Sequence, residues 1–129
     1  MDKLEYIPGD FISVYVGVKK YIVEVIGTEN ENEALLYQIK FPNGEIQYAD
    51  KDNIVPIPLT PEILEKNGWE KPDGFDSYWL DKIGLLQDGD VWHSALGSTK
   101  IAITLSNIQY VHELQHLFFV LGLNSEMEV

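Results

Sequence analysis

The sequence predicts an α+β fold, in which a strand-rich N-terminal segment is followed by a helix, antiparallel strands and a C-terminal helix. The N-terminal segment is expected to be a small SH3-like curled sheet or barrel. Three observations lead to this class. Short runs rich in β-branched and aromatic residues fill the chain before residue 57. Thr60 and Pro61 form a typical helix start, and apolar residues with helical spacing lead up to Gly122.

The N-terminal strands are predicted from these runs and from the turns between them. The runs are DFISVYV at 10–16, KYIVEVIG at 20–27, ALLYQIKF at 34–41, EIQYA at 45–49 and NIVPI at 53–57. Asn43 and Gly44 stand between two of them, which is a strong hairpin signal. The charged residues 28–33 are interpreted as a solvated loop tip. So few short strands do not suit a sandwich, and they favour a small barrel.

A boundary is predicted close to residue 57, which divides the chain into a β-rich subdomain at 1–57 and an α+β subdomain at 58–129. Two prolines at this boundary favour extended chain. Thr60 is a good N-cap with proline in the first helical turn, and Asn67 with Gly68 ends that helix.

The remainder of the second segment is predicted to be strands and one final helix. Aromatic and aliphatic runs alternate with the turn sequences PDG, QDGD and LGST, which indicates three or four antiparallel strands. The final helix is expected to be capped by Ser106, with Gln109 in the capping-box position, and to be closed by Gly122.

Composition and charge exclude several classes of function. The 129 residues contain no Cys, which excludes disulfides, thiolate metal sites and a cysteine nucleophile. The formal net charge is -12 and all nine basic residues are Lys, so contacts with a nucleic-acid backbone or with guanine edges are disfavoured. The first residues show no secretory signal, and no apolar run is long enough to span a bilayer. We therefore expect a cytoplasmic protein that binds no cofactor, nucleic acid or membrane and whose partner is a protein.

Residues 112–116 read HELQH, which matches the HExxH motif of zinc hydrolases. On a helix His112 and His116 share one face and can reach the same zinc ion, while Glu113 activates a bound water. A third ligand is hard to place, because His93 lies upstream and few residues follow the motif. Both histidines also fall opposite the apolar stripe of the helix. We therefore interpret the helix as structural, and we expect its polar side, with His112 and His116, to face solvent or a hydrogen-bonding neighbour. The alternative is a zinc site of His112 and His116 with Glu113 as the catalytic residue.

Two blocks of the sequence, IVPIPLTPEILEKNGWE at 54–70 and YVHELQHLFFVLG at 110–122, resemble a family of small uncharacterised proteins. The family is frequent in Bacteroides-type gut bacteria, and many members are associated with prophages or mobile elements. The resemblance implies no known activity. It does imply Asn at the position of His116, which suggests that the HExxH pattern arose here by one substitution on an existing helix. Gly68-Trp69 departs mildly from the glycine pair of the family pattern.

Together these observations favour a non-enzymatic, cytoplasmic binding or accessory module, and the resemblance implies an origin on a phage or mobile element. A zinc-dependent hydrolase built on the HELQH helix is the alternative from another class. A weaker alternative is an acidic DNA mimic, which would present carboxylates at regular spacing along one exposed face.

Overall fold

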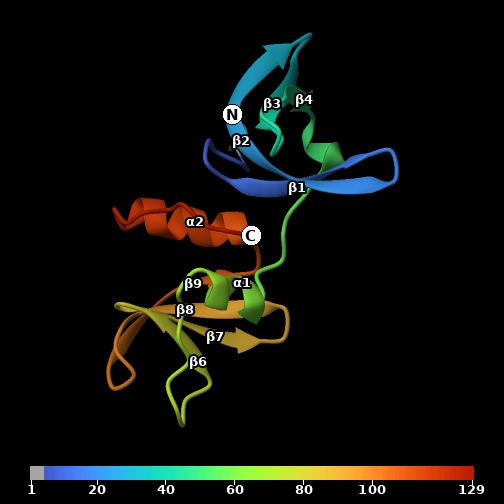
Figure 1. Cartoon of the computed structure of the whole chain (residues 1–129). Helices are drawn as coiled ribbons and strands as arrows, with labels where there is room; N and C mark the ends of the chain where they lie inside the picture. The colour runs from blue at the N-terminus through green and yellow to red at the C-terminus, as the bar shows by residue number, and fades with distance from the viewer. Residues whose placement is uncertain (1–4) are drawn as a thin grey trace.

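A computed structural model describes residues 5–129, which form two antiparallel sheets (Figure 1). The first sheet has the strand order β4-β3-β2-β1-β5. Its strands are β1 (Phe11–Val16), β2 (Lys19–Glu31), β3 (Ala34–Lys40), β4 (Ile46–Ala49) and β5 (Ile54–Val55), and a short 3-10 helix, η1 (Lys51–Asn53), precedes β5. The alternating apolar residues of these strands form a core of their own, which includes Ile12, Val23, Val25 and Ile39.

The turns of the first sheet agree with the sequence prediction at one hairpin and differ from it at another. Asn43 and Gly44 connect β3 to β4, with Gly44 at a φ of 89°, so the predicted hairpin is confirmed. The charged stretch 28–33 is not a loop tip, because β2 continues to Glu31 and only Asn32 and Glu33, both with positive φ, make the turn. A two-residue turn joins two long strands directly, so both strands continue up to the turn. The polar composition of residues 28–33 therefore did not indicate where β2 ends.

The first sheet is curled and open at its edges. A bulge in β2 between Val25 and Gly27 bends this long strand. In the described chain β4 and β5 stand at opposite ends of the strand order and are not hydrogen-bonded to each other. The backbone ladder therefore does not close into a barrel.

Helix α1 (Pro61–Lys66) lies where the cap residues predicted it. The Ile63 N–H donates to Thr60 Oγ1 at 3.3 Å, and Pro61 occupies the first turn, where no donor is lost. Asn67 ends the helix, and Gly68 follows with a φ of 87°. The predicted helix between Thr60 and Asn67 is confirmed.

The second sheet has the order β6-β7-β8-β9 and is formed by four strands. They are β6 (Ser77–Leu80), β7 (Ile83–Asp88), β8 (Val91–Gly97) and β9 (Ala102–Ile108). Its core combines side chains from the sheet with side chains from both helices, and Trp92, Leu85 and Leu64 are completely buried in it.

Helix α2 (Val111–Val120) begins later than the sequence predicts. Ser106 belongs to β9 and does not cap the helix, because β9 pairs with β8 as far as the Trp92–Ile108 pair. The capping-box position is taken by Glu113, whose Oε1 accepts from the Tyr110 N–H at 3.0 Å. Gly122 closes the helix as predicted, with a φ of 72°.

The predicted α+β class is therefore wrong, and the protein is mostly β. Strands account for 47% and helices for 15% of the structure, and α2 is the only helix in residues 5–129 that exceeds two turns. The sequence prediction overestimated helix because β9 extends through residues that also carry helix-capping chemistry. Pairing along the whole length of β8 outweighs one potential N-cap at Ser106.

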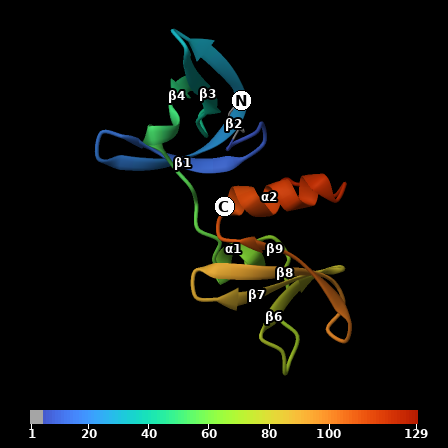
Figure 2. The ribbon, with the colours of Figure 1, turned by 180° about the vertical axis from the view of Figure 1, so that it is seen from behind.

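Helix α2 lies between the two sheets, as both Figure 1 and Figure 2 show. The connecting segment that leaves β5 pairs with the residues that enter α2, since Val111 N–H donates to Ile57 O at 2.8 Å and Leu59 N–H to Gln109 O at 3.0 Å. The division into subdomains at 1–57 and 58–129 stays a prediction. Neither helix in the described part of the chain has the length and apolar character needed to cross a membrane.

Candidate functional site

Three residues of the HELQH string, His112, Gln115 and His116, lie on the side of α2 that faces the first sheet. The opposite side of the helix is apolar and packs into the core of the second sheet through Val111, Leu114 and Phe118. On the polar side, His112 and Gln115 are only 5% and 3% exposed. The polar side is therefore mainly an internal interface, and of its two predicted surroundings, solvent and a hydrogen-bonding neighbour, solvent is the wrong one for His112 and Gln115.

His116 contacts the carboxylate of Asp10, the residue that precedes β1. Its Nε2 lies 2.6 Å from Asp10 Oδ2, and Asp10 is almost completely buried. The same carboxylate oxygen accepts the Ile7 N–H at 2.9 Å. A buried carboxylate needs such partners, because removal from water disfavours its charge. Asp10 and His116 thus hold α2 to the first sheet.

Gln115 joins three separate segments of backbone. Its Oε1 accepts the Phe11 N–H at 2.9 Å, and its Nε2 donates to Gly9 O at 2.8 Å and to Ser125 O at 3.1 Å. The amide therefore satisfies a donor and two acceptors at the junction of the first sheet, α2 and the residues that follow α2. Gln115 belongs to the polar side of the helix, for which a hydrogen-bonding neighbour was one of the two expected surroundings.

Glu113 is occupied at the beginning of its own helix. One carboxylate oxygen accepts the backbone N–H groups of Gln109 and Tyr110, each at 3.0 Å. These are donors that have no partner within the helix, and a carboxylate there is also favoured by the helix dipole. The geometry explains Glu113 without a catalytic role.

His112 lies in an aromatic environment. Its ring centroid is 4.9 Å from that of Tyr6, 5.9 Å from that of Tyr110 and 5.5 Å from that of His116. Its Nδ1 is buried and has no hydrogen-bond partner among the described residues. Burial lowers the pKa of His112, so the ring is neutral at neutral pH. Burial is also the main cause that raises the pKa of Tyr6 to about 12.

The three residues of the zinc alternative do not form a metal centre together. His116 Nε2 contacts Asp10, Glu113 caps the helix, and His112 is enclosed by aromatic rings. Between residues 5 and 129 there is no group of three or more His, Cys, Asp or Glu side chains that could hold a metal ion. The third histidine, His93, lies on β8, where hydrogen bonds from its ring to the side-chain oxygens of Asp88 and Asn107 raise its pKa.

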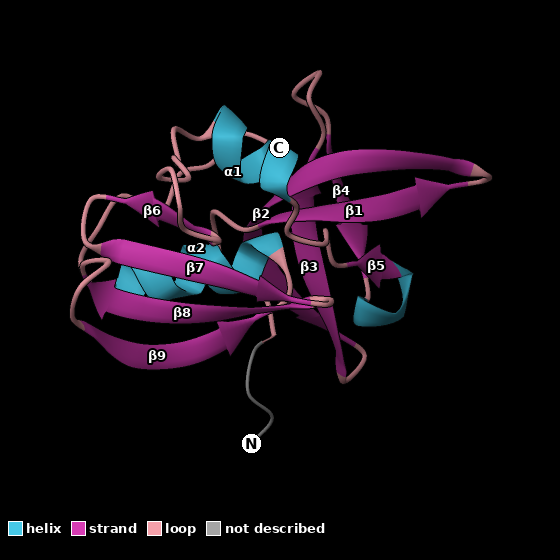
Figure 3. Ribbon diagram, turned by 90° about the horizontal axis from the view of Figure 1, so that it is seen from below, coloured by secondary structure: helices cyan, strands magenta, loops and turns pink. Residues whose placement is uncertain are grey.

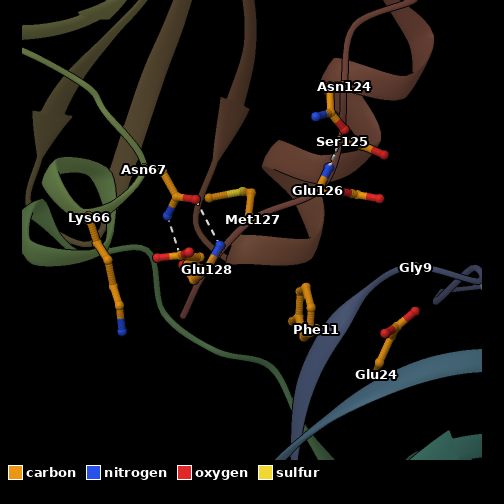
Figure 4. A pocket seen from close by; sticks show the side chains of 10 residues that line it. All are labelled: Gly9, Phe11, Glu24, Lys66, Asn67, Asn124, Ser125, Glu126, Met127 and Glu128. Carbon is orange, nitrogen blue, oxygen red and sulfur yellow. Dashed lines mark hydrogen bonds between the residues drawn. The ribbon is translucent and has the colours of Figure 1, made fainter.

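A cleft of about 660 Å³ opens beside this interface, between the first sheet and the residues that follow α2 (Figure 4). Phe11 and Glu24 come from β1 and β2, and Lys66 and Asn67 come from the end of α1. The remaining lining residues are Gly9, Asn124, Ser125, Glu126, Met127 and Glu128. A second cavity, of about 470 Å³, is also lined by Phe11 and Glu24, which indicates that it adjoins the first.

Residues 124–128, which have no regular secondary structure, line one wall of this cleft and are held through their backbone. The Asn67 side chain donates to Glu128 O at 2.7 Å and accepts the Glu128 N–H at 2.7 Å, as Figure 4 shows. Met127 is buried against the core that contains Trp69. Sequence analysis did not find this cleft, because it identified Asn67 only as a helix terminator.

No protein-family model, curated protein or solved structure matches this chain significantly.

Proposed function

We propose that this protein is a non-enzymatic, cytoplasmic module that binds an extended, basic segment of a partner protein in the cleft between its first sheet and residues 124–128. The observation that carries the proposal is the composition of this cleft. Its walls bring together three carboxylates, Glu24, Glu126 and Glu128, and a single cation, Lys66. A volume of about 660 Å³ lies within the range of cavities that hold ligands.

Charge supports a basic partner. The net charge of -12 creates a negative field that attracts cations over long distances and accelerates association with a positively charged segment. Carboxylates in the cleft then select Lys or Arg side chains at close range. Phe11, which is half-buried at the edge of the cleft, offers an apolar contact for the stem of such a side chain.

The way in which the cleft holds residues 124–128 supports an extended ligand. The Asn67 amide pairs with both backbone groups of Glu128, an arrangement that recognises main chain and requires no particular side chain. The same type of contact would suit a strand-like segment of another protein that lies along the remaining free volume.

An accessory role, in place of a hydrolytic one, is supported by the internal contacts of the HELQH residues. His116, Glu113 and Gln115 all have partners within the protein, so their presence is explained by packing of the helix. The absence of Cys is consistent with the cytoplasm, where disulfides are rare. An origin on a mobile element rests on the family resemblance alone.

The proposal can be tested by NMR titration of the labelled protein with pools of lysine-rich peptides and with glutamate-rich peptides of equal length. The lysine-rich pool should shift the amide signals of Phe11, Glu24 and residues 124–128, and the glutamate-rich pool should not. Glu24→Gln should weaken binding, whereas Glu29→Gln should not. Glu29 is the matched control because it lies on the same strand, is exposed and does not line the cleft. Equal effects of the two variants, or shifts spread over the whole surface, would mean that the cleft is not the site.

The hydrolase alternative has its own measurement. Protein purified without chelator should carry clearly less than one equivalent of zinc by elemental analysis. One equivalent of zinc that is lost in His116→Asn would contradict the non-enzymatic proposal.

A further inference from the structure

The outer edge of β9 differs from the other three edges of the two sheets. Edge strands present unpaired backbone groups, and proteins usually protect them with charges, short length or additional pairing. β4 and β5 are short and are flanked by Glu45, Asp50 and Asp52, and β6 already pairs with Glu70 through its Trp79. β9 spans seven residues, contains no charged residue and pairs only with β8 in the described structure.

Backbone groups in the first half of β9 point away from the sheet. Ser98 N–H donates to Ile101 O at 2.8 Å, and the register then pairs Gly97 with Ala102, Leu96 with Ile103 and Ala95 with Thr104. Hydrogen-bonded and non-hydrogen-bonded pairs alternate in an antiparallel ladder. Ile103 therefore bonds to β8, while the N–H and C=O groups of Ala102 and Thr104 face outward. The backbone of Gly97 agrees with this alternation, because its N–H points away from β9 and donates to the carbonyl oxygen of Lys82 on the other side of β8.

The side chains of the same segment form an apolar stripe. Ile101, Ile103 and Leu105 occupy alternate positions and so lie on one face. Ile101 is 81% and Ile103 is 68% exposed, which is unusual for isoleucine in a strand. The bulge in this strand begins only after Thr104, so the stripe is regular where it is most exposed.

This stripe lies in the least acidic part of the chain. Residues 91–112 contain no Asp or Glu, although the whole chain has 21. Two copies of a protein with a net charge of -12 repel each other over most of their surfaces. A contact between copies is therefore least opposed by charge at β8 and β9.

We infer that two copies of this chain associate through antiparallel pairing of their β9 strands, about a two-fold axis at Ile103. Ala102 of one copy then bonds to Thr104 of the other through the outward backbone groups. Ile103 meets its own counterpart, and Ile101 comes opposite Leu105. The two four-stranded sheets become one continuous sheet of eight strands, and this edge disappears.

A second copy fits this edge better than an unrelated strand, because the segment is complementary to itself. In the two-fold register every pair on the apolar face joins two aliphatic residues, and such cross-strand pairs stabilise sheets. The other face pairs the small residues Ala102 and Thr104. Lys100 comes opposite Ser106 of the second copy, so no like charges meet.

Sedimentation equilibrium over a wide concentration range tests the inference, and the wild-type protein should be a dimer that dissociates on dilution. Ile103→Lys places two lysines at the axis, and Thr104→Pro removes an outward N–H that β8 does not use. Each should raise the dissociation constant more than about tenfold, the factor that corresponds to 1.4 kcal/mol. Val18→Lys is the matched control, because Val18 is completely exposed in the β1–β2 turn, and this variant should dimerise like the wild type.

Three further measurements make the test specific. Far-UV circular dichroism should show that all three variants fold. In a mixture of differently labelled copies, NOEs should connect Ala102 of one copy with Thr104 of the other. Higher salt should strengthen the dimer, because it screens repulsion between the acidic surfaces. A wild-type protein that is monomeric at every concentration, or a dimer that neither Ile103→Lys nor Thr104→Pro weakens, would overturn the inference.

Discussion

Gln115→Leu removes one buried amide and almost preserves side-chain volume, so it isolates the polar contribution of this residue. The amide makes three hydrogen bonds, to Phe11, Gly9 and Ser125. At about 1 kcal/mol for each bond, the free energy of unfolding should fall by about 3 kcal/mol. Because the Phe11 N–H and the Gly9 carbonyl are left without this partner, the cost should not be recovered by better apolar packing.

This cost can be measured by urea unfolding that is monitored by both far-UV circular dichroism and tryptophan fluorescence. Trp69, Trp79 and Trp92 all lie in the second half of the chain, so fluorescence reports on that half and circular dichroism on both. Gln47→Leu is the control, since Gln47 is exposed and bonds only to Glu45 at the surface. A cost below about 0.5 kcal/mol, the range of ordinary surface substitutions, would refute the assignment of Gln115 as a link between α2 and the first sheet.

Four other predictions follow from the same structure. His116→Ala should lower the free energy of unfolding by about 1–3 kcal/mol in urea titrations, because the buried Asp10 carboxylate loses a hydrogen-bond partner. Burial lowers the pKa of His112, so below about pH 6.5 the unfolded chain binds more protons than the folded one. The melting temperature should therefore fall as the pH decreases in this range. Thermal melts should show a smaller fall for His112→Phe. Gly97→Ala should cost more than about 1 kcal/mol in thermal unfolding, because φ is 144° and a Cβ would collide with the carbonyl oxygen of Ile101. Duplex DNA should show no salt-dependent binding in fluorescence anisotropy, since a net charge of -12 without Arg leaves little counterion release.

Local signals in the sequence were sufficient where one turn or cap decides the structure. Asn43 and Gly44 form their hairpin, and Thr60 caps α1, because both depend on residues only a few positions away. Ser106 shows the limit of such signals. Its helix-capping chemistry is real, but pairing with β8 extends β9 through it, and no local pattern measures the stability of that ladder.

The candidate site was less predictable, because its contacts connect opposite ends of the chain. The HELQH pattern drew attention to the correct face of the helix, yet the residues that complete that face are Gly9, Asp10 and Phe11. A single sequence does not show which distant turn will cover a polar helix face. The sequence did offer one signal, which is the high density of polar residues on α2. When such a helix packs between two sheets, each of its buried polar side chains needs a hydrogen-bond partner.

The contact between Gln115 and Gly9 spans 106 positions of the chain, and this separation has a consequence for folding during synthesis. Strands β1 to β5 pair mainly with their neighbours in sequence, so the first sheet can form while the ribosome is still translating the second. Until α2 emerges, however, the Asp10 carboxylate has no His116 and the backbone of residues 9–11 has no Gln115. The nascent first sheet is therefore expected to stay incompletely ordered at this turn, and the rate at which the protein matures should depend on how quickly α2 closes over it.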